Sequence, residues 1–198
     1  MNALHLLYNY PPQVFKFWNE MCGRGTSDTS GVIATATADA RAISPDIVTV
    51  TDVIAALERS SAWRDKSDLV FSEAVEKKIL LKEDSLDSMW EVDLSGVSFP
   101  VAHTAIRYVL KRLMEFAQQG GKETLQDMTF ITGVGLGQKS QRDDVGEEGL
   151  TPVTLREFVR ETLRNEYEIY TTIPKFAMGT VVIKKEMLVR WMNNNQRV

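Results

Sequence analysis

The chain has 198 residues, 43% hydrophobic and 25% charged, which is the composition of an ordinary globular protein. This composition excludes collagen-like and disordered classes, and the single cysteine, Cys22, excludes both a disulfide framework and a cysteine-based zinc site. The formal net charge of −4 excludes a uniformly basic nucleic-acid-binding protein. Any binding of nucleic acid therefore requires positive charge that is concentrated locally.

The first residues, 1–10, are apolar but lack the cationic start and the small-residue cleavage site of a secretory signal. They are not rich in arginine and serine either, so no targeting peptide is visible. No apolar run reaches the roughly 20 residues that a membrane span needs, and we expect no membrane partner. Because residues 1–10 have the composition of an interior helix, we expect the chain to be the C-terminal fragment of a longer protein.

Helical spacing dominates the first 81 residues. A helix is predicted over 14–22, after a turn at Pro11-Pro12, and the small polar residues 26–44 are predicted to be an insertion. A helical stripe follows over 47–57, although its β-branched start also permits a strand. A second helix, from about Ala62 to Lys78, has Leu69, Val70, Ala74 and either Val75 or Phe71 as its inward residues. Residues 45–78 thus form a helical hairpin.

This hairpin resembles a pentatricopeptide repeat in Pro45–Thr49, Val53–Leu57 and Asp68–Lys77, which fall at the offsets of that family's unit. The resemblance implies an α-solenoid remnant that reads single-stranded RNA at about one base per repeat. Thr51 matches a base-contacting position, whereas Leu81 stands where a polar partner is expected. At least three repeats are normally needed for a stable solenoid. A generic helical hairpin remains the alternative.

A polar linker, 82–89, separates the hairpin from a stretch in which strands and helices alternate. The predicted elements are a strand at Trp90–Leu94, a helix at Phe99–Phe116, a strand at Met128–Ile131, a helix capped by Thr151 with Pro152 at its first position, strands at Glu168–Tyr170 and Gly179–Ile183, and a helix at Glu186–Met192. This order predicts an α/β layer fold with short crossover helices over 90–198.

Residues 132–140 form a glycine-rich loop, but the spacing does not match a nucleotide-binding motif, because Gln138 occupies the position where a glycine is required. The glycines still permit close backbone approach, their amides could form a nest for an anion, and Lys139 and Ser140 could add donors. The alternative is a turn whose glycines only satisfy positive φ angles.

Residues 90–198 also resemble the small MutS-related (Smr) domain. The motifs are Val92–Gly96, similar to a motif ending Asp-Leu-His-Gly, and Ile131–Gly135, similar to Thr-Gly-x-Gly; Pro152-Val153, Ile173-Pro174 and Gly179–Val182 fit as well. The full expectation is a mixed α and β chain, with a degenerate pentatricopeptide-repeat hairpin over 1–81 and a small α/β Smr-like sandwich over 90–198.

Proteins that join these two parts act in RNA processing and gene expression in plastids and mitochondria, so the resemblance implies an organellar protein that binds RNA, or DNA. In some members it also implies metal-assisted endonuclease cleavage. Here Ser95 replaces the motif histidine, and a serine hydroxyl does not titrate near neutral pH. We therefore favour binding of nucleic acid over efficient cleavage.

Three hypotheses stay open. In the first, RNA phosphates bind to Ser95, Gly96, Thr132, Gly133, Gly135, Lys139 and Ser140, with Thr51 as a further contact in the hairpin. In the second, Asp93 is catalytic in an endonuclease that uses Mg²⁺ or Mn²⁺; no other cofactor is expected. In the third, acidic surfaces bind protein partners. Two further expectations are a partly exposed His103 on a helix flank, and a stripe of Arg156, Arg160 and Arg164 on one helix. The stripe is either a solvated helix face or, together with Lys139, a basic track for a phosphate backbone.

Overall fold

The computed structural model describes residues 10–24, 45–80, 90–133 and 153–195. These residues form six α-helices and one three-stranded sheet, a mixed α and β architecture, as expected. The chain divides into two compact units, 1–80 and 81–198, and each unit is described by itself. None of the helices among the described residues is long and apolar enough to span a membrane. The insertion 26–44 and the linker 82–89 lie outside the described residues.

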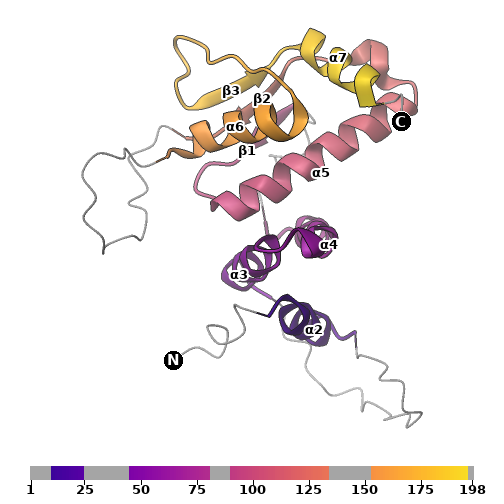
Figure 1. Ribbon diagram of the computed structural model, residues 1–198, viewed down its shortest axis with the longest axis vertical. Coiled ribbons are helices and arrows are strands. Elements are labelled where there is room, and N and C mark those ends of the chain that lie inside the picture. The colour runs from indigo at the N-terminus through magenta and orange to yellow at the C-terminus, as the bar shows by residue number, and fades with distance from the viewer. Residues whose placement is uncertain (1–9, 25–44, 81–89, 134–152, 196–198) are drawn as a thin grey trace. The chain divides into compact units, whose positions relative to one another are not determined.

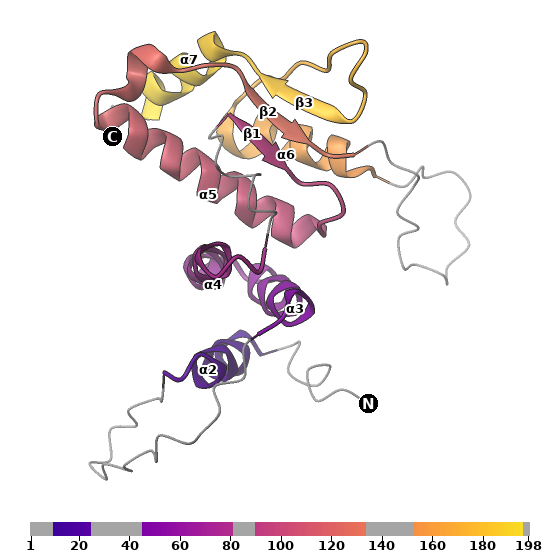
Figure 2. The ribbon, with the colours of Figure 1, turned by 180° about the vertical axis from the view of Figure 1, so that it is seen from behind.

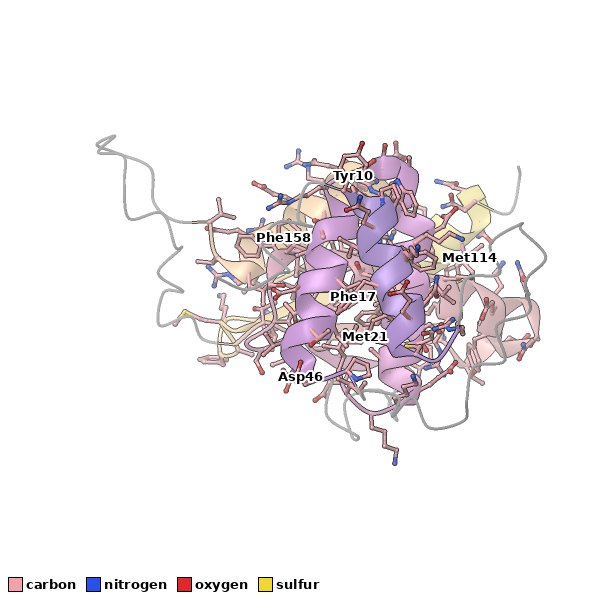
Figure 3. All side chains as sticks on the ribbon, turned by 90° about the horizontal axis from the view of Figure 1, so that it is seen from below. Tyr10, Phe17, Met21, Asp46, Met114 and Phe158 are labelled. Carbon is pink, nitrogen blue, oxygen red and sulfur yellow. The ribbon has the colours of Figure 1, made fainter. Side chains whose placement is uncertain are left out.

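The first unit consists of α2 (Pro11–Met21), α3 (Ile47–Glu58) and α4 (Arg64–Glu76), with a short 3₁₀ turn at Ser61–Trp63 before α4. Figure 3 shows Tyr10 at one end of α2 and Met21 toward the other, where α3 begins after Asp46. The two prolines lie inside the first turn of α2 and not before it. A helix tolerates proline there because its first amides have no intrahelical partner.

Helix α3 begins at Ile47, which settles the choice between helix and strand at its β-branched start. The carboxylate of Asp46 accepts a hydrogen bond from the backbone N–H of Thr49 at 2.8 Å and so caps the helix. In α4 the buried apolar residues are Val70, Phe71 and Ala74, whereas Leu69 is 40% exposed. The prediction that Leu69 faces inward is therefore wrong, and Phe71 holds the core position.

The second unit contains β1 (Glu91–Asp93), α5 (Phe99–Gln118), β2 (Met128–Ile131), α6 (Leu155–Tyr167), β3 (Thr180–Ile183) and α7 (Lys185–Asn195), with a 3₁₀ turn at Gly121–Thr124 (Figure 1). The sheet order is β1-β2-β3. Strands β1 and β2 are parallel and α5 connects them, as the alternating pattern predicted.

Strand β3 runs antiparallel to β2, so α6 does not connect parallel strands as expected. The cause lies in the segment between α6 and β3. Thr172 pairs with Val182 in an antiparallel bridge, so this segment doubles back along β3 before the strand begins. The predicted strand at Glu168–Tyr170 is absent, because Glu168 adopts a φ of 56° and ends α6.

One face of the sheet packs on α5 and α6. In the strand register, Val92 lies beside Phe130 and Phe130 beside Val181, and all three are fully buried. Figure 2 shows α6 behind the sheet and α5 beside it. The stacked rings of Phe99 on α5 and Phe158 on α6, with centroids 4.8 Å apart, join the two helices. The result is a two-layer arrangement over the parallel strand pair.

Helix α6 begins three residues later than expected. Thr154, and not Thr151, is the N-cap, and it forms a reciprocal capping box with Glu157. Asp127, just before β2, fastens the start of α7: its carboxylate accepts hydrogen bonds from the backbone N–H of Lys185 at 2.9 Å and from Lys184 Nζ at 2.7 Å. Both contacts lower the pKa of Asp127, and the bond from Lys184 contributes most.

Candidate functional site

The turns that follow β1 and β2 lie side by side. Asp93 pairs with Ile131 in the parallel register, and the backbone N–H of Leu94 donates to the carbonyl of Ile131 at 2.7 Å. A Cβ placed on Gly133 would lie 3.4 Å from the Cβ of Ser95. We call residues 93–96 together with residues 131–133 the strand-end rim. The rim thus joins the two motifs at the carboxyl ends of parallel strands, where α/β sheets commonly bind ligands.

Asp93 shapes the first turn of the rim. Its Oδ1 accepts hydrogen bonds from the backbone N–H of Ser95 at 2.8 Å and from the Ser95 hydroxyl. Gly96 follows with a φ of 81°, which a side chain would make strained. Ser95 and Gly96 are both exposed. One carboxylate oxygen of Asp93 is therefore committed to the turn, and the turn presents Ser95 and Gly96 to solvent.

Thr132 acts inside the rim and does not face outward. It is 6% exposed, and both its backbone N–H and its hydroxyl donate to the carbonyl of Gly179, at 2.7 and 2.9 Å. These bonds fasten the end of β2 to the residue just before β3. Gly133 follows at a φ of 74° and is half-buried. Thr132 therefore positions the turn, while Gly133 brings it close to Ser95.

The remaining expected site residues are not placed at the rim. Gly135, Lys139 and Ser140 lie outside the described residues. Thr51 is half-buried on α3 and belongs to the first unit. The structure therefore brings five of the expected residues together: Asp93, Ser95, Gly96, Thr132 and Gly133.

The segment before β3, which Thr132 binds at Gly179, carries an exposed aromatic side chain and accepts a hydrogen bond from a basic one. Arg156, in the first turn of α6, donates from Nη1 to the carbonyl of Met178 at 2.8 Å, next to the Gly179 that Thr132 binds. Phe176, in the same segment before β3, is fully exposed. Arg156 was expected from the sequence as part of a charged stripe, whereas Phe176 was not expected as a site residue. The available signal was an aromatic residue that follows Lys175 and precedes Gly179 by three positions.

His103 is buried, at 8% exposure, which corrects the expectation of a partly exposed flank. Its Nε2 lies 2.9 Å from a carboxylate oxygen of Glu166 on α6, and its Nδ1 lies 3.2 Å from Nη1 of Arg107. An arginine always donates, so Nδ1 accepts and Nε2 carries the proton toward Glu166. His103 thus links α5 to α6 through a polar contact.

The described residues contain no cluster of side chains that resembles a metal site. Among residues 10–24, 45–80, 90–133 and 153–195, no group of three or more histidine, cysteine, aspartate or glutamate side chains could hold a metal ion.

Comparisons with protein-family models, curated proteins and solved structures find no match to this chain.

Proposed function

We propose that the second unit binds single-stranded RNA at the strand-end rim and does not cleave it efficiently. The observation that carries this proposal is the close approach of Gly133 to Ser95, because it sets both motifs at one edge of the sheet. A backbone free of side chains at Gly96 and Gly133 allows a phosphate to come close. The segment before β3, which Thr132 binds at Gly179, adds a stacking surface in the exposed ring of Phe176 and a positive charge in Arg156, which donates to Met178.

The chemistry of the rim favours binding over cleavage. An endonuclease needs a group that accepts or donates a proton near neutral pH, and Ser95 supplies none. Loss of a general acid or base typically reduces a rate by about 10²- to 10⁴-fold. Asp93, the remaining candidate, has one oxygen engaged by Ser95. The sequence motifs resemble those of Smr domains in organellar proteins, and we propose organelle RNA processing as the setting of this function.

The test uses the full chain and fluorescently labelled single-stranded RNA over a series of salt concentrations. Lys139→Ala should weaken binding and lower the slope of log affinity against log salt by about 0.7 units, because one phosphate contact on a single strand is lost. The matched control is Lys111→Ala, an exposed lysine on α5. An unchanged slope in Lys139→Ala would remove this residue from the interface.

A second arm separates binding from the two other hypotheses. The same RNA is incubated with Mg²⁺ or Mn²⁺, beside an Asp93→Asn control, and we expect it to remain intact. Cleavage that Asp93→Asn abolishes would identify an endonuclease instead. An absence of affinity for both RNA and single-stranded DNA at low salt would overturn nucleic-acid binding and favour a protein-interaction scaffold.

A further inference from the structure

A hollow on the surface lies at the C-terminal end of α6, whereas the strand-end rim lies near its N-terminal end. The hollow has a volume of about 480 Å³ and lies between the last turn of α6, the segment after it and α7. Its lining includes Arg164, Asn165, Tyr170, Arg190, Trp191 and Asn194. We call it the α6–α7 pocket. Arg164 follows Arg156 by eight residues of helix, or about 12 Å, so the pocket is separate from the rim.

The charge of the pocket is positive. Arg164 and Arg190 are both exposed, and the lining contains one carboxylate, that of Glu168. Within the described ranges, neither arginine forms a hydrogen bond or an ion pair with a neighbour. The planar guanidinium offers paired donors that match a phosphate. Two such groups therefore face the same hollow and are available to a phosphate.

The pocket also presents an aromatic face, for a structural reason. Glu168 ends α6 in the left-handed region, and Ile169, which is fully buried, anchors the segment that follows. The next residue, Tyr170, is thereby left 60% exposed at the mouth of the pocket. Tyr167 on α6 and Trp191 on α7 pack edge to face, with ring centroids 6.5 Å apart. Both rings line the pocket.

The combination of groups distinguishes among ligands. An acidic peptide would engage the arginines but would make no particular use of an exposed ring. A nucleotide in a single strand presents a phosphate and a flat base together, and bases stack on tyrosine in such sites. The amides of Asn165 and Asn194 offer both donors and acceptors to a base edge.

From this geometry we infer that the α6–α7 pocket binds one nucleotide of a single-stranded RNA, with its base against Tyr170 and its phosphate on Arg164 and Arg190. The inference rests on the proposed function and extends it to a second contact. A smaller hollow of about 190 Å³ shares Arg164 and Tyr170 and also includes Arg160. It continues the surface along α6 toward Arg156.

Carboxylates also line this smaller hollow, and they limit its attraction for phosphate. Glu157 and Glu161 balance the charge of Arg160 and Arg164 there. The carboxylate of Glu157, however, accepts hydrogen bonds from Thr154, so it is held at the start of α6. The larger pocket, with its excess of positive charge, is therefore the part of this surface that we assign to a nucleotide.

The experiment measures binding of a labelled 12-nucleotide oligouridine to the full chain as a function of salt. Arg164→Ala/Arg190→Ala should lower the salt slope by about 0.7 units, since the two arginines share one phosphate and one phosphate contact on a single strand contributes about 0.7. The control, Lys111→Ala/Arg112→Ala, makes the same change in charge at two exposed residues of α5, neither of which lines the pocket. A pocket variant that is indistinguishable from this control overturns the inference.

Tyr170 provides a test that does not depend on charge. Tyr170→Ala should weaken binding about 5- to 100-fold through loss of stacking, whereas Tyr170→Phe should bind like the unchanged chain. Equal affinity of the alanine and phenylalanine variants would contradict a stacked base. If RNA binds and responds to Lys139→Ala but not to the pocket variants, only this inference fails. If RNA does not bind at low salt, the proposed function fails with it.

Discussion

At the scale of single residues, Phe176 gives the sharpest prediction about the rim. Its ring is fully exposed, so Phe176→Ala should leave the free energy of unfolding nearly unchanged. Affinity for single-stranded RNA should fall by about 1–3 kcal/mol, the value of one stacked base. Anisotropy titration measures the affinity and urea denaturation the stability. The control is Tyr10→Ala, another exposed aromatic, in the first unit, and an equal loss in both variants would argue against a base contact at Phe176.

Gly133 makes a second residue-scale prediction, this one about stability. Its φ of 74° is costly for a residue with a Cβ, whereas the 3.4 Å approach to Ser95 is an ordinary contact. Gly133→Ala should therefore lower the free energy of unfolding by about 1–2 kcal/mol. Gly133→Asn should recover part of that loss, because asparagine tolerates the left-handed region. Urea denaturation of both variants provides the measurement, and an asparagine variant less stable than the alanine one would contradict the reasoning.

His103 shows where residue-level prediction from sequence stops. Its position one turn into α5 was visible, but Glu166, its partner, lies 63 residues away on α6. Nothing in local spacing reveals such a pairing, because it depends on how two helices pack. The strand-end rim was more predictable, since two motifs that each follow a parallel strand must end at the same sheet edge.

At the scale of elements, the fastening of α7 by Asp127 predicts a dependence of stability on pH. Hydrogen bonds from Lys184 and from the Lys185 backbone hold the pKa of Asp127 below its ordinary value. Hydrogen bonds from Thr49 lower the pKa of Asp46 in the same way. Hydrogen bonds from Thr154 lower the pKa of Glu157. A lowered folded-state pKa contributes stability that is present above the ordinary value near 4. That stability is lost as the pH falls through the folded value.

Asp127→Asn removes one of these titrating groups and isolates its contribution. The variant should be less stable than the unchanged chain at pH 7, and its stability should decline less as the pH falls below about 4. Urea denaturation at a series of pH values between 7 and 2 measures both effects. Glu115→Gln, an exposed carboxylate on α5, is the control. Parallel curves for Asp127→Asn and the unchanged chain would contradict the assigned role.

Element boundaries were predictable where patterns were strong. The bounds of β2, Met128–Ile131, and the start of α5 at Phe99 agree with the sequence analysis. The start of α6 does not, because Pro152 suggested a first turn at Thr151, while the capping box Thr154-Leu-Arg-Glu157 decides it. That box was readable in the sequence. The direction of β3 was not, since it depends on the bridge between Thr172 and Val182.

At the scale of the whole molecule, burial in the first unit and positive charge in the second are both set by the fold. The first unit buries Val14, Trp18 and the inner face of α3, yet leaves Ile47 and Val48 more than half exposed. Composition established a globular chain, and the spacing of apolar residues indicated its helical and sheet-forming segments. Neither revealed where positive charge concentrates, because Arg164 on α6 and Arg190 on α7 line the same pocket only once the chain is folded.

Photocrosslinking shows whether RNA touches the strand-end rim, because it identifies the residues that are in contact with the RNA. The full chain is irradiated with a single-stranded RNA that carries 4-thiouridine, and the linked peptides are identified by mass spectrometry. We predict crosslinks in the peptides that contain Ser95-Gly96, Gly133 and Phe176. RNA that binds but crosslinks only to the first unit, or to α5 surfaces away from the rim, would contradict the account.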